Sequence, residues 1–97
     1  MSSPVVNGIV GPVKDQTVTL NGSPQLALPA NNNRTHLQFQ APIGGLTYSF
    51  TNSSCAPGLT GCFSLAPGVI YQPQGGVPQN ALYFNGTNGQ IVPLTES

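Results

Sequence analysis

The sequence predicts an all-β protein: an antiparallel β-sandwich, jelly-roll-like, or a small barrel, with about seven or eight short strands. Apolar and polar residues alternate over short stretches, as in half-buried strands. Turn-forming Gly, Pro and Asn residues recur between these stretches. No window of about 11 residues carries a helical apolar stripe free of Pro and Gly, so no substantial helix is expected.

Residues 1–15 are expected to form an extended N-terminal arm, because the Pro and Gly residues within it exclude a helix. An apolar arm suits the addition of a strand to a neighbouring sheet, and a partly ordered tail is the alternative. Residues 16–97 are expected to form the β-sandwich domain. The candidate interface combines apolar arm residues with two later polar residues: Pro4, Val5, Val6, Ile9, Val10, Val13, Arg34 and His36.

The first half of the predicted sandwich contains four strands. The first is rich in β-branched residues and ends at Asn21-Gly22, a tight-turn signal. In the third, Leu37 and Phe39 are expected to face inward while His36 faces solvent. The expected strands are 16–20, 25–28, 35–40 and 46–50.

The second half is predicted to contain four further strands. They are shorter and are separated by Pro- and Gly-rich turns. The last two are expected to pair with each other across the Asn- and Gly-rich turn 85–89. The expected strands are 62–65, 69–71, 80–84 and 90–94.

Charge is almost absent from this chain. Four residues carry a formal charge, Lys14, Asp15, Arg34 and Glu96, whereas an ordinary domain is about a quarter charged. Acid–base catalysis, phosphate binding and nucleic-acid binding all need ionisable side chains, so these functions are not expected. Ser, Thr, Asn and Gln supply 33 of the 97 residues and are expected to cover the surface. The composition therefore predicts a structural or binding protein and no enzyme.

Few residues are candidates for specific chemistry. His36 is the single histidine, and too few ligands accompany it to predict a metal site or a cofactor. Cys55 and Cys62 bracket a turn-rich loop that brings the chain back on itself. A disulfide and two free thiols are both compatible with that spacing, since synthesis in the cytosol favours thiols and later exposure outside the cell favours oxidation. Neither cysteine has a neighbouring base, so no catalytic residue is predicted.

Arg34 stands out because it opens a predicted strand directly after an Asn run. It is expected to pair with Glu96, with Asp15 or with carbonyl groups across an interface, and a solvated turn arginine is the alternative. The three tyrosines, Tyr48, Tyr71 and Tyr83, could form a sugar-stacking surface. Two of the three fall on or near inward-looking strand faces, so core packing with a hydroxyl at the rim is the favoured interpretation. No signal peptide or membrane span is expected, which places synthesis in the cytoplasm.

The order of motifs resembles small virion proteins of tailed bacteriophages. An apolar strand leads into Ala30-Asn31 and Arg34, followed by Leu37-Gln-Phe-Gln40. The strand-turn Phe63-Ser-Leu-Ala-Pro-Gly68 and the segment Val77-Pro-Gln-Asn-Ala81 come later. The resemblance covers about residues 25–96 and is to head decoration or cement proteins and to related β-domains of fibres and spikes.

This resemblance implies a domain that assembles by symmetry, commonly as a homotrimer, and has no active site. The expected function is to bind the major capsid protein on the outer surface of the virion and to cement the shell at subunit junctions. The alternative is a receptor-binding or adhesion domain of a fibre or spike that recognises glycans through Tyr, Asn and Gln loops. The pair Cys55 and Cys62 departs from the family pattern, which is Gly-rich in that region.

Overall fold

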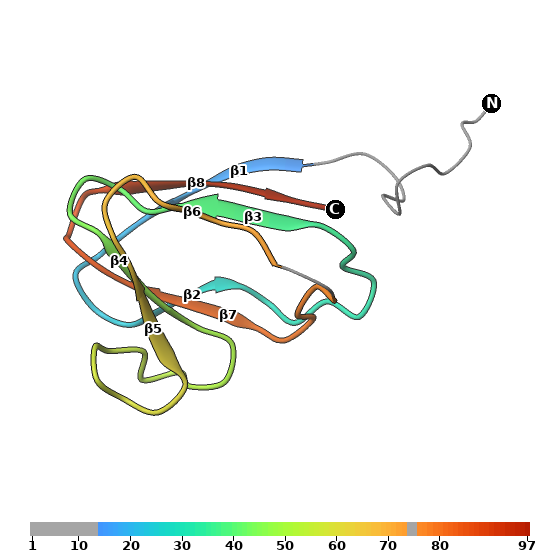
Figure 1. Ribbon diagram of the computed structural model, residues 1–97, viewed down its shortest axis with the longest axis horizontal. Helices are drawn as coiled ribbons and strands as arrows, with labels where there is room; N and C mark the ends of the chain where they lie inside the picture. The colour runs from blue at the N-terminus through green and yellow to red at the C-terminus, as the bar shows by residue number, and fades with distance from the viewer. Residues whose placement is uncertain (1–13, 74–75) are drawn as a thin grey trace.

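Figure 1 shows a computed structural model of the chain, in which residues 14–73 and 76–97 are described. This part of the chain contains eight β-strands and no helix, which confirms the predicted all-β class. The strands are β1 (Lys14–Thr19), β2 (Gln25–Leu28), β3 (Leu37–Gln40), β4 (Leu46–Ser49), β5 (Cys62–Leu65), β6 (Ile70–Tyr71), β7 (Leu82–Asn85) and β8 (Ile91–Glu96).

The strands form two four-stranded sheets, with the orders β1-β8-β3-β6 and β2-β7-β4-β5. Every pairing is antiparallel. In Figure 1 the two sheets lie as two layers, one above the other. The chain changes sheet at every connection except the one between β4 and β5, which is the winding of a jelly roll. The sandwich alternative is therefore confirmed over the barrel.

The predicted pairing of the last two strands is wrong. β7 pairs with β2 and β4, whereas β8 pairs with β1 and β3 in the other sheet. The turn between them is held by the end of β1: Leu20 donates its N–H to the carbonyl of Gln90 and accepts one from Gly89, both at 2.8 Å. These two bonds carry the chain across the end of the sandwich instead of folding it into a hairpin.

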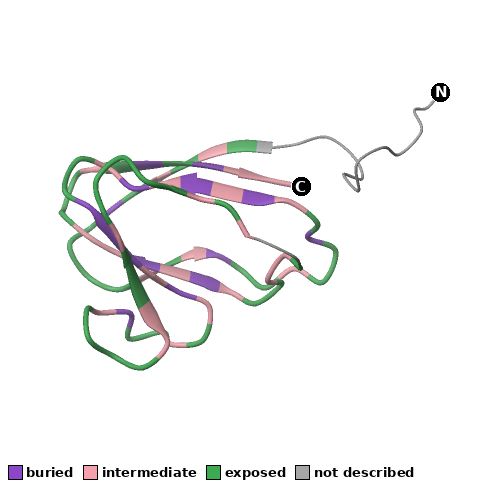
Figure 2. Ribbon diagram, viewed as in Figure 1, coloured by how far each residue is buried: buried purple, intermediate pink, exposed green. Residues whose placement is uncertain are grey.

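Between the sheets lies a core of leucine and phenylalanine side chains. The predicted inward residues Leu37 and Phe39 are both 1% exposed. Phe39 stacks on Tyr71 at a centroid distance of 4.8 Å and meets Phe84 and Tyr48 edge-on at 5.0 and 5.5 Å. Figure 2 shows the buried residues along the facing strands of the two layers. The aromatic cluster thus joins both sheets at the centre of the domain, with Tyr48 and Tyr71 in the core as predicted.

The sheet begins slightly earlier than the sequence indicates. β1 starts at Lys14, whose register partner is Glu96, so residues 14 and 15 belong to the sheet and not to the predicted arm. The remaining arm residues, including candidate interface residues Pro4, Val5, Val6, Ile9, Val10 and Val13, lie outside the described residues.

Candidate functional site

Arg34 is a charged residue buried in the interior of the domain, with 1% of its surface exposed. Its Nε donates a hydrogen bond to Oε2 of Glu96 at 2.8 Å, and the two side chains form an ion pair. Arg34 follows a turn in which the N–H of Asn33 is held by the side-chain oxygen of Asn31 at 2.9 Å. This turn points the guanidinium into the protein, so the solvated alternative is wrong and the pairing with Glu96 is confirmed.

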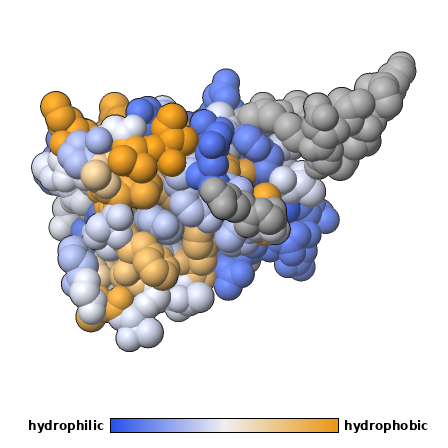
Figure 3. Space-filling view, in the orientation of Figure 1, coloured by the Kyte–Doolittle hydropathy of each residue, from blue (hydrophilic) through white to orange (hydrophobic). Residues whose placement is uncertain are grey.

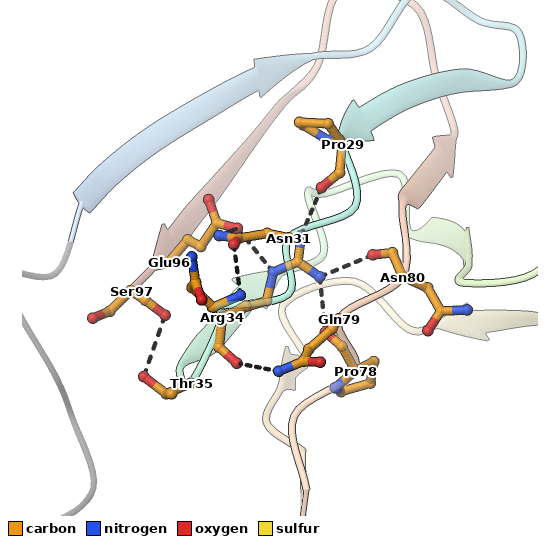
Figure 4. A network of polar contacts seen from close by, with 10 residues as sticks. Pro29, Asn31, Arg34, Thr35, Pro78, Gln79, Asn80, Glu96 and Ser97 are labelled. Atoms are coloured by element: carbon orange, nitrogen blue, oxygen red, sulfur yellow. Dashed lines mark hydrogen bonds and ion pairs between the residues drawn. The ribbon is translucent and has the colours of Figure 1, made fainter.

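Three backbone carbonyls complete the coordination of the guanidinium (Figure 4). Nη1 donates to the carbonyls of Pro78 and Asn80 at 2.8 and 2.9 Å, and Nη2 donates to the carbonyl of Pro29 at 3.0 Å. A buried charge is tolerated only when its donors are satisfied, and here each nitrogen has a partner. As a candidate interface residue, Arg34 therefore cannot reach a partner protein, because its own chain surrounds it.

The arginine ties together two loops that are distant in sequence, residues 29–34 and residues 78–81. Two further bonds reinforce the junction: the N–H of Asn31 donates to the carbonyl of Gln79 at 2.9 Å, and the side-chain amide of Gln79 donates to the carbonyl of Arg34 at 3.4 Å. The resulting loop pair is fixed at one end of the second sheet.

A second structural element covers the outer face of that sheet. The loop 50–61 folds back over β4, so that Thr47 and Ser49, on the side of the sheet away from the core, are 6% and 0% exposed. Ser49 Oγ donates to the carbonyl of Gly61 at 2.8 Å and accepts the N–H of Asn52 at 2.9 Å. We call this loop the clasp. It gives the second sheet a third layer over part of its width.

Cys55 anchors the clasp. It is completely buried, its thiol donates to the carbonyl of Thr47 at 3.5 Å, and its carbonyl accepts the side-chain amide of Asn85 at 2.8 Å. Burial, together with the nearby thiol of Cys62, raises the pKa of the Cys55 thiol to about 11. Both cysteines are free thiols in this structure. The cysteine pair thus holds the clasp by packing and hydrogen bonds.

Between the fixed loops and the clasp lies an open depression of about 740 Å³. Tyr83 lines it from β7, and Phe50 lines it from the start of the clasp. The other lining residues are small or polar: Ala30, Asn32, Thr51, Ser53, Gln79, Asn80 and Ala81. Among the residues that the structure describes, no charged side chain lines it. The volume is in the range of small-molecule sites, about 300–1,000 Å³, although the depression is open to solvent.

A different surface gathers four of the seven large apolar side chains that are exposed among the described residues. At one end of the outer face of the first sheet, Ile43 is 84% exposed, Ile91 54%, Ile70 48% and Val69 43%. Figure 3 shows apolar side chains gathered at the upper left, over β6 and the adjoining loops. Together with the exposed Pro93, these residues form what we call the apolar patch.

The members of the apolar patch adjoin one another. Ile70 pairs with Gln40 in register, and Ile70 and Pro93 line the same shallow hollow beside β3. The N–H of Gly44 donates to Oε1 of Gln90 at 2.9 Å, which brings the loop carrying Ile43 next to the start of β8. The charged ends of β1 and β8 pair at the opposite end of this sheet. The patch is therefore uncharged and contiguous.

The remaining predicted site residue, His36, is half-buried beside β8. Its Nε2 lies 3.0 Å from the hydroxyl of Thr95, and its backbone exchanges two hydrogen bonds of 3.1 Å with Ser97. Among the described residues, no group of three or more His, Cys, Asp or Glu lies close enough to hold a metal ion. The same part of the chain has no helix of the length and apolarity needed to cross a membrane.

The sequence did not single out the depression or the apolar patch. The Asn and Gln residues of the depression were recognisable as turn formers, and the isoleucines of the apolar patch as strand residues. The grouping of these residues on each surface depends on loops from separate parts of the chain. The chain has no significant match among models of protein families, characterised proteins or solved structures. Its function is therefore inferred from the chemistry of these surfaces.

Proposed function

We propose that this chain is a structural virion protein that binds the outer surface of a phage capsid and cements the shell at subunit junctions. The observation that carries the proposal is the apolar patch on the outer face of a jelly roll that has almost no charge. A monomer rarely exposes a contiguous apolar patch that has no partner. The resemblance of residues 25–96 to phage decoration proteins points to the major capsid protein as that partner.

Attachment of this kind needs no chemistry. A protein that contacts two or three shell subunits at once stabilises their assembly by mass action, because it binds the assembled shell and not the separate subunits. We propose a homo-oligomer, a trimer in keeping with the resemblance, made in the host cytoplasm and then added to the virion. The apolar arm residues before Lys14 would contribute to the contact with the shell or with a neighbouring copy.

The chemistry of the patch predicts how attachment responds to salt. Screening weakens contacts between exposed charges, and the patch contains none. Occupancy of the capsid should therefore remain unchanged between about 0.1 and 1 M salt. Release of the protein over that range would show that ion pairs and not apolar burial hold it.

Copy number tests the proposal directly. Quantitative mass spectrometry of purified virus particles, normalised to the major capsid protein, should find hundreds of copies per particle if the protein decorates the shell. A handful of copies would place it at the tail or a vertex and would favour the alternative function. Absence from particles would overturn both.

The alternative, a receptor-binding β-domain of a fibre or spike, is favoured by a separate observation. The depression beside Tyr83 presents amide and hydroxyl side chains on rigid loops, which suits recognition of a host surface molecule. The isolated domain would then attach to host cells, which the decoration function does not require. Binding of labelled protein to cells tests the alternative, and copy number per particle tests decoration.

A further inference from the structure

We propose that the depression lined by Tyr83, Phe50, Asn32, Asn80 and Ser53 is a binding site for a neutral saccharide. The proposal rests on the free hydrogen-bonding groups, the aromatic surfaces and the absence of charge in this one place. It does not depend on capsid binding, since the apolar patch lies on the other sheet.

The first argument is the set of unused polar groups. Within the described residues, the side-chain amides of Asn32 and Asn80 and the hydroxyls of Ser53 and Tyr83 make no hydrogen bond. Figure 4 shows that Asn80 holds Arg34 through its backbone carbonyl while its amide points away. An amide offers both donors and acceptors, and so does a hydroxyl. These groups therefore match the vicinal hydroxyls of a sugar, each of which also donates and accepts.

The second argument is the pair of aromatic side chains. Tyr83 and Phe50 are half-buried and both line the depression, although the Phe50 ring also packs against Tyr48 and Tyr71 of the core. The face of a sugar ring that carries C–H groups is apolar and can pack on an aromatic ring while the hydroxyls at its edge reach the surrounding amides. Small residues, Ala30 and Ala81, leave room for a ring between them.

The third argument is charge. Arg34 lies behind the depression, but Glu96 and three carbonyls satisfy its guanidinium, and 1% of the residue is exposed. An anionic or cationic ligand would lose water without meeting an opposite charge, which is costly. A neutral ligand has no such cost, so the site favours neutral sugars over acidic ones.

The fourth argument is rigidity. Arg34 fixes both loops that carry Asn32 and Asn80, and the Ser49 bonds fix the clasp that carries Ser53. A site whose loops are already ordered pays less conformational entropy on binding. Because the depression is open, we still expect weak binding, with a Kd of about 1 mM per site. Several copies on one particle would raise the apparent affinity through avidity.

The test is a titration of isotope-labelled protein with sugars, in which changes in the amide chemical shifts report binding. The probes are maltose, cellobiose, lactose and N,N-diacetylchitobiose, each added to about 10 mM, with sialyllactose as the acidic counterpart of lactose. We expect at least one neutral disaccharide to shift the amides of residues lining the depression. We also expect sialyllactose to bind no more tightly than lactose.

Substitutions locate the site. Asn80→Ala removes the free amide but keeps the carbonyl that binds Arg34, and should weaken binding about fivefold, as expected for one lost hydrogen bond. Tyr83→Phe, which removes the hydroxyl alone, tests that group separately. Asn33→Ala is the matched control, because Asn33 is an exposed neighbour that does not line the depression. It should bind as tightly as the unchanged protein.

Three results would overturn the proposal: no shift with any of the neutral sugars, shifts confined to residues away from the depression, or tighter binding of sialyllactose than of lactose. An Asn80→Ala variant with unchanged affinity would remove Asn80 from the site. Capsid occupancy is measured separately, so failure here leaves the proposed decoration function standing.

Discussion

Nε of Arg34 lies 2.8 Å from Oε2 of Glu96, a residue 62 positions later in the chain. The bond joins the loop before β3 to the end of β8, and the same guanidinium holds the loop before β7. Two of the four formally charged residues of this chain thus neutralise each other in its interior. The pair fixes the relative positions of three chain segments that meet beside the depression.

Removing this arginine should strongly destabilise the protein. Arg34→Ala leaves Glu96 without its cation and three carbonyls without a donor, so we expect a loss of about 3–5 kcal/mol in the free energy of unfolding. Arg34→Lys should cost less, about 2 kcal/mol, because the ammonium keeps the charge but reaches fewer acceptors. Urea denaturation followed by tyrosine fluorescence measures both.

Asn33→Ala is again the control, because its exposed side chain makes no bond among the described residues, and it should change stability by less than about 0.5 kcal/mol. A cost below about 1 kcal/mol for Arg34→Ala would mean that the network is dispensable for folding.

Stability should fall in alkaline solution because of Cys55. Burial, with a smaller contribution from the Cys62 thiol, raises the pKa of this thiol from 9.0 to about 11 in the folded protein. Above about pH 9 the unfolded chain loses the thiol proton while the folded chain keeps it, so the free energy of unfolding decreases as pH rises towards the folded pKa. We expect a loss of about 2–3 kcal/mol between about pH 8 and pH 11, measured by urea denaturation under reducing conditions.

Tyr48 and Tyr71 act in the same direction, because burial raises the pKa of each. Cys55→Ala separates the contributions: its stability should be lower at neutral pH but should fall less steeply with pH. An equally steep fall in that variant would assign the alkaline loss to the tyrosines.

The clasp should be sensitive to the backbone at Gly61. This residue has a φ of 79°, and a Cβ atom placed there would collide with the hydroxyl of Thr51. Gly58 has a φ of 86° but open space around it. Gly58→Ala should therefore cost about 1 kcal/mol for backbone strain alone, and Gly61→Ala should cost more.

Thr51→Ala in the Gly61→Ala background removes the colliding hydroxyl. Thermal denaturation should then show the double variant close to Gly58→Ala. If the double variant remained as unstable as Gly61→Ala alone, the collision with Thr51 would not be the cause.

A charge in the apolar patch should abolish attachment to the particle without unfolding the protein. Ile91→Asp places a carboxylate in the proposed contact, where it would lose water on binding. Leu26→Asp is a closely matched control, because Leu26 is 55% exposed and Ile91 54%, but Leu26 lies on the other sheet. We expect particles to lose the Ile91→Asp protein at least tenfold and to retain the Leu26→Asp protein. Equal retention would move the contact away from the patch.

Local sequence patterns were sufficient to locate the strands. Alternation correctly placed Leu37 and Phe39 in the core, because side chains of successive strand residues point to opposite faces. The same alternation could not indicate that Thr47 and Ser49 are buried, since the clasp covers them from outside the sheet. The burial of these two side chains depends on the path of the clasp, and tertiary contacts determine that path.

Strand pairing was harder to predict for a similar reason. The Gly- and Asn-rich turn after β7 looks like a hairpin turn, but hydrogen bonds to Leu20 direct the chain into the other sheet. The partner Glu96 of Arg34 was among the predicted alternatives because so few acids exist. The carbonyl contacts of Arg34 all come from its own chain, and the loops that supply them could not be predicted because they are distant in sequence.

The position of β8 has a consequence for biosynthesis. Within the described residues β1 pairs with β8 alone, and β3 has β8 on one side, although β8 is translated after the other seven described strands. Until it emerges from the ribosome, β1 has no strand partner in the first sheet and the guanidinium of Arg34 lacks the carboxylate of Glu96. The apolar strands of the nascent chain therefore lack their partners during translation. Folding depends on contacts between distant segments, so folding is slow and the incomplete chain is exposed to aggregation.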